Sequence, residues 1–279
     1  MGVAQQVKSA LRPIYSAILP ASIGRSRPVF DRVRRRYFAR HPMKVKRDVQ
    51  DPALAELLAN GIVLLPKYFD GALIKTVHDK ALAALEQVRG GGAPKEWNGM
   101  RFADDGVYRL LGIEQTVPET AAILNDPRLL TIAREYLGYP VRGTHAYLDY
   151  KPDFGKHDET TVPHMDSWMS QIKIFTLLND IDPLSAPMVY WKRSHRDGEW
   201  RHEIDYQSFK PSYLGTAGVC PPHALRDRCG EKPGDLEKFT VTGPAGTVAI
   251  ADVRGFHRAS NVFGGYRLEV VQKITIETP

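Results

Sequence analysis

Cysteine is scarce in this chain of 279 residues, which contains only Cys220 and Cys229. Both lie in one stretch rich in proline and glycine, and their spacing matches neither a paired zinc site nor a disulfide framework. The sequence also lacks an uninterrupted apolar run long enough for a transmembrane helix, an internal repeat and a low-complexity segment. We therefore expect a cytoplasmic protein with one large folded domain.

Acidic residues are nearly absent from the first 47 positions, which hold twelve lysines and arginines but only one acid, Asp31. The rest of the chain holds 26 basic and 31 acidic side chains. The formal charge of +6 is thus a property of the leader, and the body of the chain is acidic. A basic surface across the whole domain, as in a protein that binds nucleic acid, is not expected.

Residues 1–50 form a basic leader ahead of the main domain. Within residues 3–19, apolar side chains recur at helical spacing, which predicts an amphipathic helix. We expect a helical extension that packs on its own domain or on a second subunit. The alternative is peripheral contact of residues 1–47 with an anionic membrane surface, in which case the protein would be membrane-associated.

The main domain, residues 51–279, begins with helices and continues as short strands. Three helices are predicted, with N-caps at Asp51, Asp70 and Asp126 and ends marked by Gly61, Gly90 and Gly138. Strand-like runs lie at residues 62–65, 144–150, 172–178, 188–191, 239–242, 247–252 and 268–276. This order indicates an α+β fold that is mainly β, with a sandwich or jelly roll covered on one face by N-terminal helices.

One long stretch, residues 197–238, breaks the rhythm of the strands. It contains four prolines together with several aromatic and charged residues. Loops of this length inside a domain are usually functional. We therefore expect an insertion or lid at the entrance for the substrate.

The sequence Val-Pro-His-Met-Asp at residues 162–166 places His164 and Asp166 two positions apart. On an extended chain, these two side chains point to the same face. A third donor, His257, follows the strand that ends near residue 252. Two imidazoles and one carboxylate leave open positions on a metal ion, which suits Fe(II) and oxygen chemistry. We predict that these three residues bind the metal and are catalytic.

Arg267 lies ten residues after His257. A glycine pair between them suits a hairpin turn, which would bring Arg267 back alongside the strand of His257. The planar guanidinium can bind a carboxylate through two hydrogen bonds. Arg267 is therefore the predicted anchor for the far carboxylate of 2-oxoglutarate.

Further motifs surround these residues: Asp149-Tyr150-Lys151-Pro152, His164-Met165-Asp166, and the stretch 187–195, which ends in Ser194-His195. With them, the chain after residue 50 resembles the phytanoyl-CoA dioxygenase family of Fe(II)- and 2-oxoglutarate-dependent oxygenases. Within the last stretch, Arg193 stands where that family usually has glycine.

The resemblance implies a double-stranded β-helix core of the cupin-like type and the cofactors Fe(II), 2-oxoglutarate and O2. It also implies that Tyr147 and Phe175 line the 2-oxoglutarate pocket and that Ser260 contributes a hydroxyl group there. Halogenases of the superfamily have a small residue in place of the carboxylate, so Asp166 favours hydroxylation. The expected activity is hydroxylation of an unactivated C–H bond in a small-molecule, lipid-linked or glycan substrate.

Candidate substrate contacts come from loops and strands near the predicted metal site. They are Arg101, Arg109, Trp168 and Arg254. Two alternatives remain open at this point. One is a cupin-like metalloenzyme that does not use 2-oxoglutarate, and the other is a non-catalytic module that binds membranes or nucleic acid.

Overall fold

The computed structural model describes residues 27–41, 49–89, 100–102, 107–139, 141–153, 163–197, 201–202, 205 and 236–276. The predicted helix at residues 3–19, both cysteines and most of the 197–238 segment lie outside these ranges.

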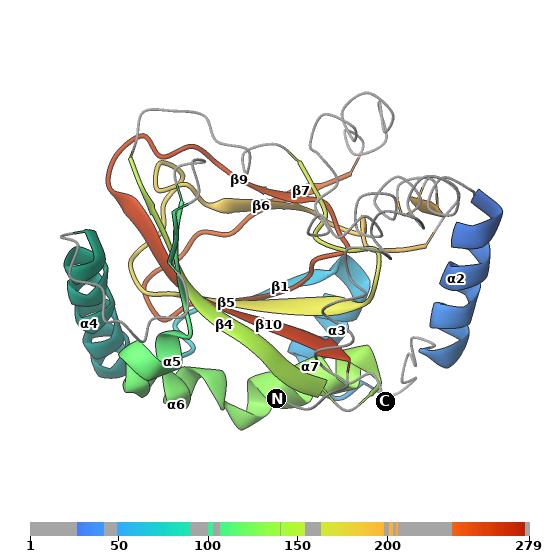
Figure 1. Cartoon of the computed structure of the whole chain (residues 1–279), viewed down its shortest axis with the longest axis horizontal. Coiled ribbons are helices and arrows are strands. Elements are labelled where there is room, and N and C mark those ends of the chain that lie inside the picture. The colour runs from blue at the N-terminus through green and yellow to red at the C-terminus, as the bar shows by residue number, and fades with distance from the viewer. Residues whose placement is uncertain are drawn as a thin grey trace, which may run out of the picture.

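Two antiparallel sheets face each other (Figure 1). The larger has the order β1 (Ile62–Leu65), β8 (Val248–Asp252), β5 (Gln171–Leu177), β10 (Tyr266–Ile276), β4 (Val141–Pro152), β3 (Tyr108–Leu111) and β2 (Met100–Phe102). The smaller has the order β7 (Lys238–Thr240), β6 (Met188–Trp191) and β9 (His257–Ala259). Two facing sheets with crossing connections form a jelly roll, and the predicted α+β class is confirmed.

Helices cover the outer face of the larger sheet (Figure 1). They are α3 (Pro52–Asn60), α4 (Gly71–Arg89), α5 (Ile113–Thr116), a 3-10 turn (Pro118–Thr120), α6 (Ala121–Leu124) and α7 (Pro127–Leu137). The predicted caps are confirmed, since carboxylate oxygens of Asp51, Asp70 and Asp126 accept hydrogen bonds from backbone N–H groups of the first turns. Gly61 and Gly138 end their helices in the left-handed conformation, with φ of 78° and 72°.

A layer of apolar side chains fills the space between the sheets. Its buried members are Ile62, Phe175, Met188, Tyr190, Val241, Ala249, Ala251 and Val271. Along β5 and β10, the residues two positions away from Phe175 and Val271 share this inner face, because side chains alternate across a strand. The intervening residues pack under the helices, as Ile174 and Ile274 do.

Helix α2 (Arg27–Arg40), in the leader, lies against the domain. Phe30 is fully buried and meets Trp168 edge-on, with ring centroids 5.9 Å apart. The backbone N–H of Ser170 donates to the hydroxyl of Tyr37 at 3.0 Å. The apolar face of α2 is thus used within the chain, beside the segment that follows the His-Met-Asp motif. No helix in the described ranges is long and apolar enough to cross a membrane.

Several short elements differ from the sequence expectation. Strands β2, β3 and β9 were not predicted, and the first two bring part of the supposedly helical half into the larger sheet. These strands have only three or four residues. Strands this short form because of the strands they pair with, so their own amino-acid composition does not predict them. Arg193 has a φ of 68°, in the left-handed region, which explains why a glycine suits this position in the family that the chain resembles.

Candidate metal centre

His164, Asp166 and His257 meet at the edge of the smaller sheet. One ligand atom from each lies within 4.8 Å of the others. His164 and His257 exchange two backbone hydrogen bonds of 2.9 Å, and the N–H of Asp166 donates to the carbonyl oxygen of Val253 at 3.0 Å. The extended backbone therefore turns both side chains of the His-Met-Asp motif toward the third residue, His257.

The protonation states of these side chains suit a divalent metal. The Nδ1 atom of His257 lies 2.9 Å from the carbonyl oxygen of Gly255, to which a protonated Nδ1 donates, leaving Nε2 as the ligand atom. Burial, and then the charge of His164, lowers the pKa of His257 to about 4, so its imidazole is neutral near pH 7. Burial alone would raise the pKa of Asp166, but Lys173 and the two histidines hold it well below its ordinary value. A neutral imidazole, as in His257, and an ionised carboxylate, as in Asp166, are forms that bind metal ions, so these residues fit Fe(II).

Two lysines lie beside this centre and were missed in the sequence. The Nζ atom of Lys173 on β5 lies 2.7 Å from Oδ2 of Asp166. Lys273 on β10 is the direct cross-strand partner of Lys173. Burial, and then the charge of Lys173, lowers the pKa of Lys273. A signal was available, because Lys173 stands between Ile172 and Ile174 in an apolar run.

Arg267 is buried, and carboxylates of its own chain surround it. Its Nη2 donates to Oδ2 of Asp149 and its Nη1 to the carbonyl oxygen of Ala186, both at 2.9 Å. Its Nε lies 3.3 Å from Oε1 of Glu269 but makes no hydrogen bond of suitable geometry among the described residues. Nε–H and the second N–H of each Nη nitrogen make none of these hydrogen bonds and can donate to a further acceptor. The residues fit 2-oxoglutarate, provided that Glu269 does not add a negative charge at the same place.

Glu269 adds no full negative charge beside Arg267 when the pH is below neutral. Its burial raises the pKa to about 7, with Asp149 adding to the effect and Arg267 opposing it. Below this pH the side chain is largely neutral and can stand beside a second carboxylate. We therefore expect 2-oxoglutarate to bind more weakly as the pH rises above 7.

The same shift predicts a pH-dependent stability. A carboxyl group whose pKa is higher in the folded than in the unfolded chain stabilises the fold fully below the unfolded value, near 4.5, and this contribution is lost as the pH rises through about 7. Glu269→Gln is expected to be more stable than the wild type by about 1–3 kcal/mol at pH 8 and nearly equal to it at pH 4.5. Urea denaturation at both pH values measures the difference. Equal differences at the two pH values would contradict a raised pKa.

The residues expected around 2-oxoglutarate lie at different depths. Phe175 is part of the core between the sheets. Burial raises the pKa of Tyr147, and the charges that act on this side chain include Lys173 and Asp166, which places it near the metal centre. Ser260 donates its backbone N–H to Pro187, next to the carbonyl group that receives Arg267.

The four candidate substrate contacts are placed apart. Arg109 donates from Nε to Asp149 at 3.0 Å, with its guanidinium 5.8 Å from the ring centre of Tyr147, so it borders the inner face. Arg101 pairs with Arg109 in the backbone register of β2 and β3, and its side chain is outside the described part of the chain. Trp168 packs in the apolar cluster under α2.

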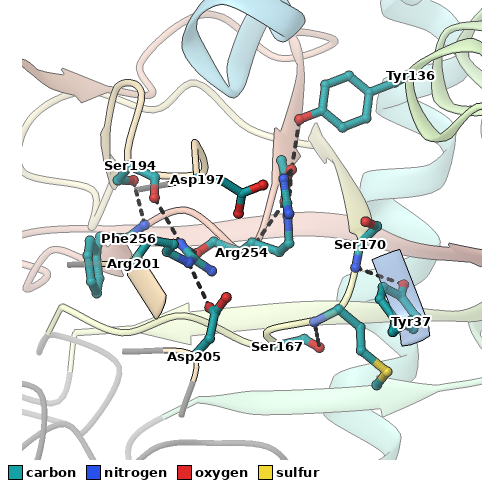
Figure 2. Close-up of polar contacts among 12 residues, drawn as sticks. Tyr37, Tyr136, Ser167, Ser170, Ser194, Asp197, Arg201, Asp205, Arg254 and Phe256 are labelled. Carbon is teal, nitrogen blue, oxygen red and sulfur yellow. Dashed lines mark hydrogen bonds and ion pairs between the residues drawn. The ribbon is translucent and has the colours of Figure 1, made fainter. Parts of the chain in front are cut away.

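Arg254 lies in a buried polar network (Figure 2). Its guanidinium pairs with Asp252 at 3.1 Å, and the Tyr136 hydroxyl donates to the same carboxylate at 2.7 Å. Arg201 donates to the carbonyl oxygens of Ser194 and Arg254. The network holds residues 252–256, which lead directly into His257, so Arg254 acts through the backbone of this loop.

Arg201 also links the loop to the leader. Its Nε donates to Asp205 at 2.7 Å, and Asp205 receives Nε of Arg34 from α2 at 3.0 Å. Arg201 and Asp205 are each 1 % exposed. Arg201 and Asp205, within the 197–238 segment, are therefore part of a packed interface between α2 and the loop before His257.

Comparison with known proteins gives one kind of relative. No protein-family model matches the sequence. The ectoine dioxygenases of Bordetella parapertussis and Bordetella bronchiseptica are each 26 % identical to it over 157 residues, which cover 52 % of this chain. The chain spans about half the length, 49 %, of these curated relatives.

Solved structures match over a larger part of the chain. EctD from S. alaskensis with bound Fe has a TM-score of 0.59 at 19 % identity, covering 84 % of this chain and 81 % of EctD. SnoN, a non-haem, α-ketoglutarate-dependent epimerase from nogalamycin biosynthesis, has a TM-score of 0.56 at 16 % identity, covering 81 % and 82 %. The chain therefore has the fold that these non-haem iron proteins share.

Proposed function

We propose that this protein is an Fe(II)- and 2-oxoglutarate-dependent dioxygenase of the phytanoyl-CoA dioxygenase type, which hydroxylates a small molecule. The observation that carries the proposal is the convergence of His164, Asp166 and His257 from distant parts of the chain. Three ligands on one face of an ion leave positions for a co-substrate and O2. Relatives and structural neighbours that use iron and 2-oxoglutarate support the same chemistry.

The protein's own residues have separate roles in this proposal. His164, Asp166 and His257 hold the metal, and the hydrogen bond from Nδ1 of His257 to Gly255 fixes its ring. Arg267 receives the distal carboxylate of 2-oxoglutarate between the sheets, where the surrounding apolar layer excludes water. Bound iron and 2-oxoglutarate supply the oxidising power for attack on a C–H bond by O2, with release of succinate and CO2.

A small-molecule substrate is favoured over a membrane-bound one. The relatives and structural neighbours of this chain include an ectoine dioxygenase and an epimerase of nogalamycin biosynthesis. The apolar residues Phe30 and Tyr37 of α2 contact the chain's own domain, so this face of the helix is used within the chain. For residues 27–40, packing on the domain is therefore the better-supported role.

Turnover of 2-oxoglutarate without added substrate tests the proposal. Iron-loaded protein is expected to convert 2-oxoglutarate slowly to succinate, in a reaction that requires O2. Asp166→Ala is expected to reduce this rate to that of free iron, while Asp79→Ala, at an exposed carboxylate of α4, leaves it unchanged. Absence of succinate from folded, iron-loaded protein would overturn the proposal. A rate that persists unchanged in Arg267→Ala would remove Arg267 as the anchor for 2-oxoglutarate, without overturning the proposed function.

A further inference from the structure

Two lysines project between the sheets at the end that holds the metal ligands. Lys173 and Lys273 are direct partners in the antiparallel pair of β5 and β10. Two positions along, Phe175 and Val271 are also direct partners and belong to the core between the sheets. Directly opposite side chains share a face, with Cβ atoms about 4.5–5.5 Å apart, and the face repeats every second residue. Both ammonium groups therefore enter the space into which Asp166 also points.

This arrangement has an energetic cost. Like charges directly opposite each other on adjacent strands are destabilising, and partial burial of an ammonium group adds to the cost. Asp166 offsets part of it through the 2.7 Å contact with Lys173. Asp166 is also the proposed metal ligand, so bound iron shares its negative charge. With a metal ion bound by Asp166, the two lysines would stand beside it as a positively charged wall.

The distal carboxylate of 2-oxoglutarate does not explain this wall, and the keto-acid end of the co-substrate is bound by the metal ion itself. Arg267, the proposed anchor for the distal carboxylate of 2-oxoglutarate, lies six residues before Lys273 on the same strand. At roughly 3.4 Å per residue, the two positions are about 20 Å apart along β10. The lysines are thus at the metal end of the interior, where a substrate must place the carbon that is oxidised.

We propose that Lys173 and Lys273 bind an anionic group of the substrate, so that the enzyme acts on small molecules with a carboxylate, phosphate or sulfate near the oxidised carbon. The proposal rests on the proposed function and adds a substrate class to it. An ammonium group on a flexible stem binds such anions as a point charge, and two of them recognise one anion without fixing its geometry.

Calorimetric titration with inorganic sulfate and with acetate tests this proposal. The protein is loaded with Zn(II) in place of iron and saturated with 2-oxoglutarate, so that the Arg267 end is filled. Wild-type protein is expected to bind both anions and not acetamide, the neutral analogue of acetate. Lys273→Met is expected to lower the affinity at least about tenfold, while Lys273→Arg stays within about threefold of the wild type. Lys75→Met, at a side chain that is 76 % exposed, is the control and keeps full affinity.

The outcomes separate this inference from the proposed function. Equal affinity of the wild type and Lys273→Met, or no binding by the wild type, would overturn the substrate class. Failure of the protein to bind 2-oxoglutarate in the preceding titration would instead count against the proposed function. Lys273→Gln is a second neutral variant in case Lys273→Met does not fold, and circular dichroism of each variant monitors folding.

Discussion

Replacing His257 with alanine is expected to lower the affinity of the protein for Fe(II) more than about 100-fold, since even partners of metal ligands are worth 10–100-fold in affinity. The imidazole is one of three proposed protein ligands. Burial lowers its pKa and so favours the neutral form, and the contact of Nδ1 with Gly255 orients the ring. Anaerobic equilibrium dialysis measures the affinity. The absorption spectrum of the Co(II) protein gives an independent view of the coordination.

A matched histidine elsewhere provides the control for this variant. His78 lies on α4, where it contacts Asp79 and Tyr266, away from the three proposed ligands. His78→Ala is expected to bind Fe(II) and Co(II) as the wild type does. Unchanged metal affinity in His257→Ala, with the protein folded, would remove His257 from the metal centre.

Arg254→Met is expected to lower the free energy of unfolding by about 3–5 kcal/mol, because it leaves the carboxylate of Asp252 buried without its charge partner. Both side chains of this pair are at most 2 % exposed. The Tyr136 hydroxyl and the backbone N–H of residue 254 also donate to the carboxylate, but neither carries a charge (Figure 2). Typical domains have only 5–15 kcal/mol in total, so the loss is large. Urea denaturation at pH 7 measures it.

Two further variants serve as controls for Arg254→Met. Arg128→Met breaks an exposed pair with Asp51 and is expected to cost at most about 1 kcal/mol. The double variant Arg254→Met, Asp252→Asn removes the orphaned charge and is expected to recover part of the stability. A cost for Arg254→Met no greater than that for Arg128→Met would show that the buried pair does not stabilise the fold. It would also reopen a direct role for Arg254 in binding substrate.

Local signals in the sequence predicted the long strands and the three longest helices of the main domain, α3, α4 and α7. Asp51 and Asp126 precede prolines, and glycines follow their helices, so the boundaries depend only on neighbouring residues. The short strands β2, β3 and β9 could not be predicted in this way, because their partners come from distant parts of the chain. Most of the expected strands agree with the structure to within three residues.

In the candidate site, too, the features that depend on neighbouring residues could be predicted, and those that depend on distant strand partners could not. The spacing of His164 and Asp166 is a local property, and the sequence therefore predicts their common direction. The pairing of Lys173 with Lys273 depends on the register between β5 and β10, which no local pattern gives. The enclosure of Arg267 by Asp149 and Glu269 depends on register as well. The sequence does contain a hint of these register-dependent residues, because they are charged side chains within otherwise apolar strands.

Anaerobic titration of the Fe(II)-loaded protein with 2-oxoglutarate tests the central claim most directly, because it requires both the metal ligands and the co-substrate anchor. The wild type is expected to develop the weak visible charge-transfer band of an Fe(II) and 2-oxoglutarate complex. His164→Ala is expected to show no band, and Arg267→Ala is expected to need far more 2-oxoglutarate to reach the same intensity. A folded, iron-loaded wild-type protein without the band would contradict the proposed function.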